Sequence, residues 1–195
     1  MNEQAFWFST GFEHITDAEG YDHILFVSLL VFAWPLEQYK KLLWLVTAFT
    51  LGHSLSLALS MKGMVDLPRN LTECLIAFSI LISLIYQLFT IKRQPSVQNA
   101  VIYFIVACFG LIHGLGFSGM LHSLLGRNSG VALPLVYFNL GLEAGQLLIV
   151  GAVVLFSLFL TRVLKVPYQR FKLICLCSIA LITLKLCAER LLLLL

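Results

Sequence analysis

Residues Phe109–Gly119, with the sequence FGLIHGLGFSG, place a single histidine inside an apolar stretch. An ionisable side chain at membrane depth is costly unless a partner holds it, and it marks a functional site by default. The histidine is His113, and its neighbours include Gly110, Gly114, Gly116 and Gly119. Glycine lets a neighbouring backbone come close. The stretch therefore predicts a membrane helix in which His113 belongs to a polar site inside a helix bundle.

The composition of the whole chain agrees with this reading. Of 195 residues, 59% are hydrophobic and 12% are charged, whereas soluble domains contain about 25% charged residues. We therefore expect an all-α, polytopic membrane helix bundle that forms a single domain over residues 1–195, with about six spanning helices. An interrupted apolar stretch at residues 5–16 predicts a short interfacial helix. The expected spans are about 21–35, 40–61, 70–91, 98–121, 131–161 and 170–195.

The distribution of basic residues predicts the orientation. The joints after the first, third and fifth spans contain Lys40, Lys41, Lys92, Arg93, Arg162, Lys165, Arg170 and Lys172. The opposite side contains Lys62, Arg69, Arg127, Lys185 and Arg190. Since the cytoplasmic side carries the excess of Lys and Arg, we expect both termini outside the cytoplasm, in a bacterial-type inner membrane.

Polar residues from separate spans fall at a similar depth. His53 lies eight residues before the end of its span and His113 nine residues before His122. At 1.5 Å per residue these positions are within about 12–18 Å of the outer surface. Imidazoles suit zinc, nickel and copper, and carboxylates supply neutralising charge, so together they fit a borderline divalent metal ion. The predicted metal ligands are Asp22, His23, His53, His113 and Glu143. Residues expected in a supporting role are His14, Glu73, Asn139, Gln146 and Ser118.

Asn139, Glu143 and Gln146 are spaced four and three residues apart, which puts them on one face of a helix. Such a face can support a metal site by fixing the imidazoles. It can equally be a stripe of hydrogen bonds that packs one membrane helix against another. Both interpretations remain open at this point.

Several motifs together resemble the HupE/UreJ family of small membrane proteins, named for accessory proteins of hydrogenase and urease systems. They are GFEHITDAEGYDHILF, FTLGHSLSLAL, ECLIAFSI, FGLIHGLGFSGML and FNLGLEAGQL. The resemblance implies a nickel or cobalt permease in which Asp22, His23 and His113 bind the metal. His53 and Glu143 lie in other family motifs. The spacing between His14 and Asp22 is longer than in well-known family members, which weakens the transfer of a family role to His14.

Three functions are compatible with these residues. The first is a permease that binds a divalent transition metal ion (nickel, cobalt or zinc) inside the membrane, which makes a transporter more plausible than an enzyme. The second is a zinc-dependent intramembrane hydrolase in which a bound metal activates water, with Glu143 as general base and Ser54 or Ser118 nearby. The third is a metal sensor or accessory subunit. The expected partners are the lipid bilayer and the metal ion, together with a second copy of the chain or a metalloenzyme-maturation protein, and no nucleic acid.

Overall fold

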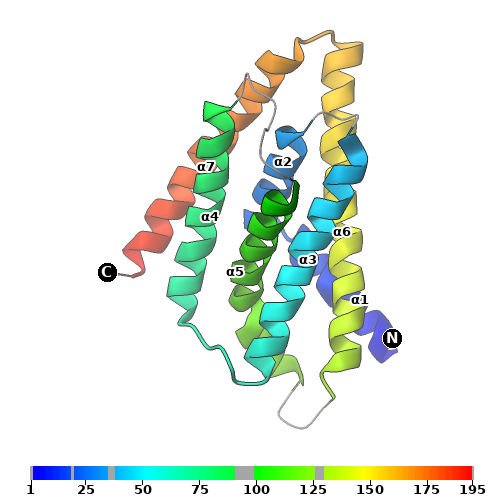
Figure 1. The fold of residues 1–195 in the computed structure, drawn as a ribbon, viewed down its shortest axis with the longest axis vertical. Helices are drawn as coiled ribbons and strands as arrows, with labels where there is room; N and C mark the ends of the chain where they lie inside the picture. Colours follow the sequence, from blue (N-terminus) through cyan, green and yellow to red (C-terminus); the bar gives the residue numbers. More distant parts are fainter. Residues whose placement is uncertain (1, 19, 35–37, 91–98, 126–129, 195) are drawn as a thin grey trace.

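The computed structural model describes residues 2–18, 20–34, 38–90, 99–125 and 130–194, and it is a bundle of helices (Figure 1). No β-strand occurs within these ranges. The helices are α1 (Glu3–Thr16), α2 (Asp22–Ala33), α3 (Tyr39–Met61), α4 (Arg69–Phe89), α5 (Asn99–Leu125), α6 (Ala132–Leu158), the π-helical turn η2 (Phe159–Val163) and α7 (Tyr168–Leu192). The all-α prediction is confirmed. Some predictions fall outside the described residues. These are the predicted span ends at residues 35, 91, 98 and 195 and the basic residues Lys92, Arg93 and Arg127.

Five helices, α3 to α7, are long and apolar enough to cross a membrane. The sixth expected span is shorter than the others, because α2 has only 12 residues. At 1.5 Å per residue it is about 18 Å long, against a hydrocarbon core of about 30 Å. The prediction of about six spans thus becomes five long helices and one short apolar helix.

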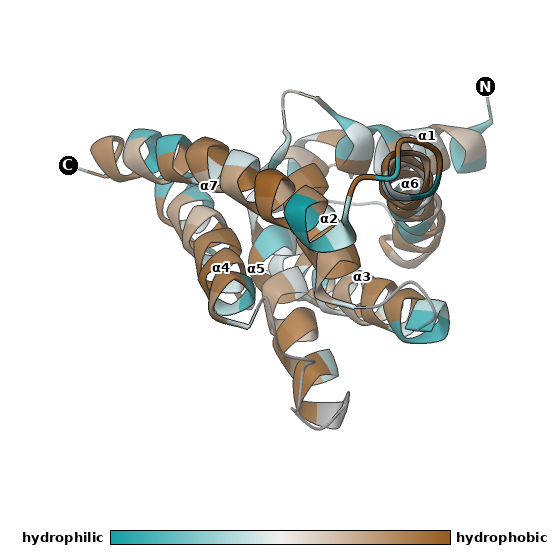
Figure 2. Ribbon diagram, turned by 90° about the horizontal axis from the view of Figure 1, so that it is seen from above, coloured by the Kyte–Doolittle hydropathy of each residue, from teal (hydrophilic) through white to brown (hydrophobic). Residues whose placement is uncertain are grey.

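The short helix α2 lies at the centre of the bundle and contacts α1, α3, α4, α6 and α7. Eight of its residues are buried, from His23 to Phe32. A helix that is apolar on all sides is stable where other helices surround it. Seen along the bundle in Figure 2, α2 lies among the other helices and α1 lies beside α6. Side chains at the N-terminal end of α2 are therefore held from several directions.

Glycines allow two pairs of helices to pack with their backbones in contact. In the pair α3 and α5, Gly110 lies against the Phe49 carbonyl oxygen and Gly114 against the His53 carbonyl oxygen. A Cβ atom at either position would collide with these oxygens. Gly110 and Gly114 form the small-xxx-small spacing that favours close packing of membrane helices. The predicted role of these two glycines is confirmed, whereas Gly119 has no atom within 4 Å of a Cβ position.

The second such pair is α1 and α6. Gly11 lies against the Phe138 carbonyl oxygen, and Gly141 lies against the Phe8 carbonyl oxygen. Trp7, Gly11 and Ile15 are the buried residues of α1. The predicted N-terminal helix is thus present and packs along α6, while its position at a membrane interface stays a prediction.

Candidate metal centre

Four helices each contribute one histidine to a single cluster. His14 comes from α1, His23 from the first turn of α2, His53 from α3 and His113 from α5. The ring centroids of His14 and His23 are 4.7 Å apart, and those of His23 and His113 are 5.0 Å apart. The His14 and His53 rings are 5.5 Å apart. On α3, His53 is nearer to the end of the helix at Met61 than to its start at Tyr39, and we call the end of the bundle at which α3 ends the site end.

Two groups of three residues in this cluster could each hold a metal ion. The first is His14, His23 and His53, and the second is Asp22, His23 and His113. Within each group the ligand atoms lie within 4.8 Å of one another. Bonds of about 2.0–2.1 Å around a tetrahedral ion place nitrogen ligands about 3.3 Å apart, so small rotations of the side chains would close either group around an ion. His23 belongs to both groups.

The imidazoles are buried but are poorly supplied with hydrogen bonds. The exposed fractions are 4% for His23, 0% for His53 and 1% for His113. Both ring nitrogens of His53, Nε2 of His14 and His23, and Nδ1 of His113 lack a hydrogen-bond partner among the described residues. Nδ1 of His23 lies 3.0 Å from the Asp22 carboxylate, an ion-pair distance without hydrogen-bond alignment. Buried polar atoms are nearly always paired, and a transition metal ion could bind one of these free nitrogens from each ring.

Phenylalanine rings surround the histidines. Phe49 lies 5.2 Å from His113 and 6.1 Å from His53, measured between ring centroids, and Phe26 lies 5.5 Å from His113. On the other side, Phe117 packs 4.1 Å from the His14 ring. These rings exclude water and lower the local dielectric, which strengthens the attraction between a cation and the Asp22 carboxylate. Sequence reasoning missed this shell, because phenylalanine is common in every apolar helix.

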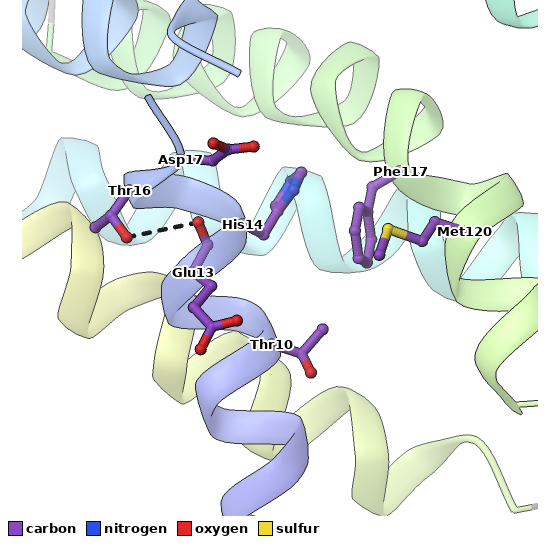
Figure 3. Close-up of a pocket in the computed structure, with 7 residues that line it drawn as sticks. All are labelled: Thr10, Glu13, His14, Thr16, Asp17, Phe117 and Met120. Carbon is purple, nitrogen blue, oxygen red and sulfur yellow. Dashed lines mark hydrogen bonds between the residues drawn. The ribbon is translucent and has the colours of Figure 1, made fainter. Parts of the chain in front are cut away.

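A pocket of about 450 Å³ leads from the surface to His14. Figure 3 shows His14 and Asp17 facing Phe117 and Met120 of α5. Glu13 and Asp17 are exposed beside the pocket, and neither Lys nor Arg is among its described lining residues. Burial and the nearby His23 hold the pKa of His14 well below its ordinary value. The His14 imidazole is therefore neutral at physiological pH, as metal binding requires.

A separate ion-pair network lies beside Asp22. The Glu73 carboxylate of α4 forms ion pairs with Arg69 Nε at 2.6 Å and with Arg190 Nη1 of α7 at 2.8 Å. A small cavity of about 40 Å³ is lined by Asp22, Glu73 and Arg190, together with Gly20, Tyr21, Ile76 and Leu186. The carboxylate of Glu73, predicted in a supporting role, is thus engaged by two guanidinium groups.

The remaining predicted residues lie outside the two histidine groups. Glu143 accepts a hydrogen bond from the Thr47 hydroxyl at 2.6 Å, and Gln146 accepts one from Thr50 at 2.8 Å. Asn139 Oδ1 is buried without a hydrogen-bond partner in the described chain. The hydroxyls of Ser54 and Ser118 donate to backbone carbonyls of their own helices. Sequence reasoning also missed Ser79, whose hydroxyl lies 3.5 Å from His113 Nε2; its place in the ECLIAFSI motif was the available signal.

A family model described as HupE / UreJ protein matches residues 1–190. The match covers nearly the whole chain, so the chain belongs to the HupE/UreJ family, and the resemblance inferred from its motifs is confirmed. Comparisons with curated proteins and with solved structures gave no match. The family and the five apolar helices indicate an integral membrane protein of the metal-transport or accessory type.

Proposed function

We propose that this member of the HupE/UreJ family is a membrane permease whose substrate is a divalent transition metal ion: nickel, cobalt or zinc. The observation that supports this most strongly is the cluster of buried imidazole nitrogens without hydrogen-bond partners in the described residues. Leaving such atoms unpaired in an apolar interior is unfavourable. Nitrogen donors with one nearby carboxylate suit these ions, while magnesium and calcium prefer oxygen ligands.

The sharing of His23 favours transport over fixed binding. An ion held by His14, His23 and His53 can exchange His14 and His53 for Asp22 and His113, with His23 as a ligand in both groups. Each intermediate then retains at least one ligand, so no step requires a bare ion in the apolar interior. Passage through a membrane needs sites that bind well enough to admit the ion and weakly enough to release it. Two overlapping groups would give the ion a second set of ligands to move to as it leaves the first.

The end of the bundle opposite the site end carries the excess of Lys and Arg. This excess supports an orientation in which the site end and both termini face out of the cytoplasm, in a bacterial-type inner membrane. In this orientation the ion enters through the pocket beside Glu13 and Asp17 and reaches His14 first. The resulting function is uptake of the metal into the cell. The membrane potential, which is negative inside, favours movement of a divalent cation in that direction.

Uptake by the purified protein in liposomes tests the proposal. We expect saturable influx of nickel, cobalt or zinc, reported by a metal-sensitive dye inside the vesicles. His113→Ala should reduce the influx to that of protein-free liposomes, because it removes a ligand from one of the two groups on the path. Gly119→Ala, in the same helix, should leave influx unchanged.

Elemental analysis of the same samples measures how much metal each chain retains, and its result can contradict the permease. One zinc per chain that survives dialysis, together with no influx, would overturn the permease in favour of a zinc hydrolase or a structural metal site. Wild-type influx by His113→Ala would also overturn it.

The acidic mouth of the pocket gives a further expectation. Neutralising Glu13 and Asp17 together, as Glu13→Gln with Asp17→Asn, should slow influx at low metal concentration by about threefold to tenfold in low salt, because fixed negative charge raises the local cation concentration. High salt should remove most of the difference by screening. The matched control is Glu3→Gln, at the exposed start of α1. An equal effect at all salt concentrations would contradict electrostatic attraction as the cause.

A further inference from the structure

A second polar cluster lies between α3 and α6, apart from the histidines. It pairs Thr47 with Glu143 and Thr50 with Gln146 through hydrogen bonds of 2.6 Å and 2.8 Å. Thr50 is three residues before His53 on α3, and Thr47 is six residues before it. At 1.5 Å per residue the cluster is about 4–9 Å farther from the site end than His53. None of its side chains belongs to either histidine group.

The charge of this cluster is not balanced. Glu143 is half-buried on a long apolar helix, and the ion pairs of the described residues do not include it. An ionised carboxylate at this depth in a membrane is costly unless a cation or a proton neutralises it. A monovalent cation would neutralise a single carboxylate in full.

The amide of Gln146 adds an unsatisfied atom to the cluster. Its side chain is fully buried, with an exposed fraction of 0%, and its Nε2 lacks a partner in the described part of the chain. The amide can also be reversed, since its two orientations have the same shape. Thr50 would then donate to the Val46 carbonyl, 3.3 Å away, and accept from Nε2. That orientation leaves Gln146 Oε1 free to bind a cation.

We propose that Glu143, Thr47, Thr50 and Gln146 form a binding site for a hard monovalent cation, sodium. All the donors are oxygen atoms, namely one carboxylate, two hydroxyls and one amide. Such a set suits a hard ion and contrasts with the imidazoles nearby. Asn139, one turn before Glu143, adds a further buried oxygen without a partner in the described residues. The ion would neutralise Glu143 and satisfy the free amide oxygen together.

A bound sodium ion would fix α3 against α6 within one turn of His53. Any effect of sodium on metal binding must be matched by an equal effect of the metal on sodium binding. Because Thr50 of the sodium site is three residues before His53 on α3, we assign sodium the role of coupling ion for transport. This role rests on the proposed permease function, whereas the binding of sodium does not.

Thermal unfolding of the detergent-purified protein tests the binding. With a chelator present, the Tm is measured in increasing sodium chloride and in choline chloride at equal ionic strength. We expect a saturable rise in sodium alone, of about 3–6 °C at ten times the Kd. The rise should be absent in Glu143→Gln and Thr47→Val. It should persist in His113→Ala and in Thr161→Val, where the lost hydroxyl serves only its own helix backbone.

The outcomes separate the two proposals. Equal Tm values for wild type in sodium and in choline would overturn the sodium site, and these contacts would then serve helix packing alone. A Tm that depends on pH but not on sodium would also overturn it, in favour of a bound proton. A sodium-specific rise without metal influx supports the site and overturns the permease. A sodium-specific rise with influx that is independent of the sodium gradient supports the site and overturns its coupling role.

Discussion

His23→Ala should abolish specific binding of nickel, cobalt and zinc. His23 is the residue that both candidate groups share, so its removal leaves two ligands in each. Loss of a supporting hydrogen bond around a metal already weakens affinity by about 10–100-fold. We therefore expect loss of a shared ligand to weaken binding by more than about 100-fold, measured by calorimetric titration of the purified protein.

Single substitutions in the two groups should behave differently. His14→Ala removes a ligand from one group and His113→Ala removes a ligand from the other, so each should weaken binding less than His23→Ala does. The double variant should approach the effect of His23→Ala. His122→Ala is the control, because this exposed imidazole lies against the Ser60 carbonyl oxygen and outside both groups. Retention of wild-type affinity by His23→Ala would contradict the shared-ligand arrangement.

The sequence alone predicts the positions of the helices and most of the residues of the histidine cluster. Long apolar stretches interrupted by charge, glycine and proline predict helix positions, and four of the five predicted ligands meet in the structure: Asp22, His23, His53 and His113. An ionisable side chain in such a stretch has a high free-energy cost if it points toward the lipid. For this reason the type of residue and its depth already indicate an inward-facing site.

His14 could not be placed from the sequence, because its position depends on contacts between distant segments. It reaches the cluster only because α1 packs along α6, with Gly11 against the Phe138 carbonyl oxygen. For Glu143, the sequence predicts the helix face but not the helix that this face contacts. Its spacing from Asn139 and Gln146 defines a helix face, but spacing does not determine which neighbour that face meets. The neighbour is Thr47 of α3, and Glu143 as a metal ligand stays a prediction.

Gly114→Ala should separate α3 from α5 and dismantle the centre. The added Cβ would meet the Ser56 hydroxyl and the His53 carbonyl oxygen, and would lie 3.0 Å from His53 Cα. Two of these atoms are backbone, so α3 itself must move, and His53 moves with it relative to His113. Overpacking costs about 1–3 kcal/mol and occasionally more. At about 2–4 °C per kcal/mol we expect the Tm to fall by about 2–12 °C, with loss of metal binding.

Gly119→Ala is the matched comparison, since it adds the same atom five residues later in α5. A Cβ there has no atom within 4 Å, and alanine is favoured over glycine inside a helix by about 1 kcal/mol. This variant should therefore be at least as stable as wild type and should bind metal normally. Equal Tm values for the two variants would contradict close packing of α3 and α5. A lower Tm with normal metal affinity for Gly114→Ala would instead separate helix packing from the geometry of the histidines. The expected combination, lower stability with lost binding, follows because Gly114 faces the backbone of the residue that supplies a ligand.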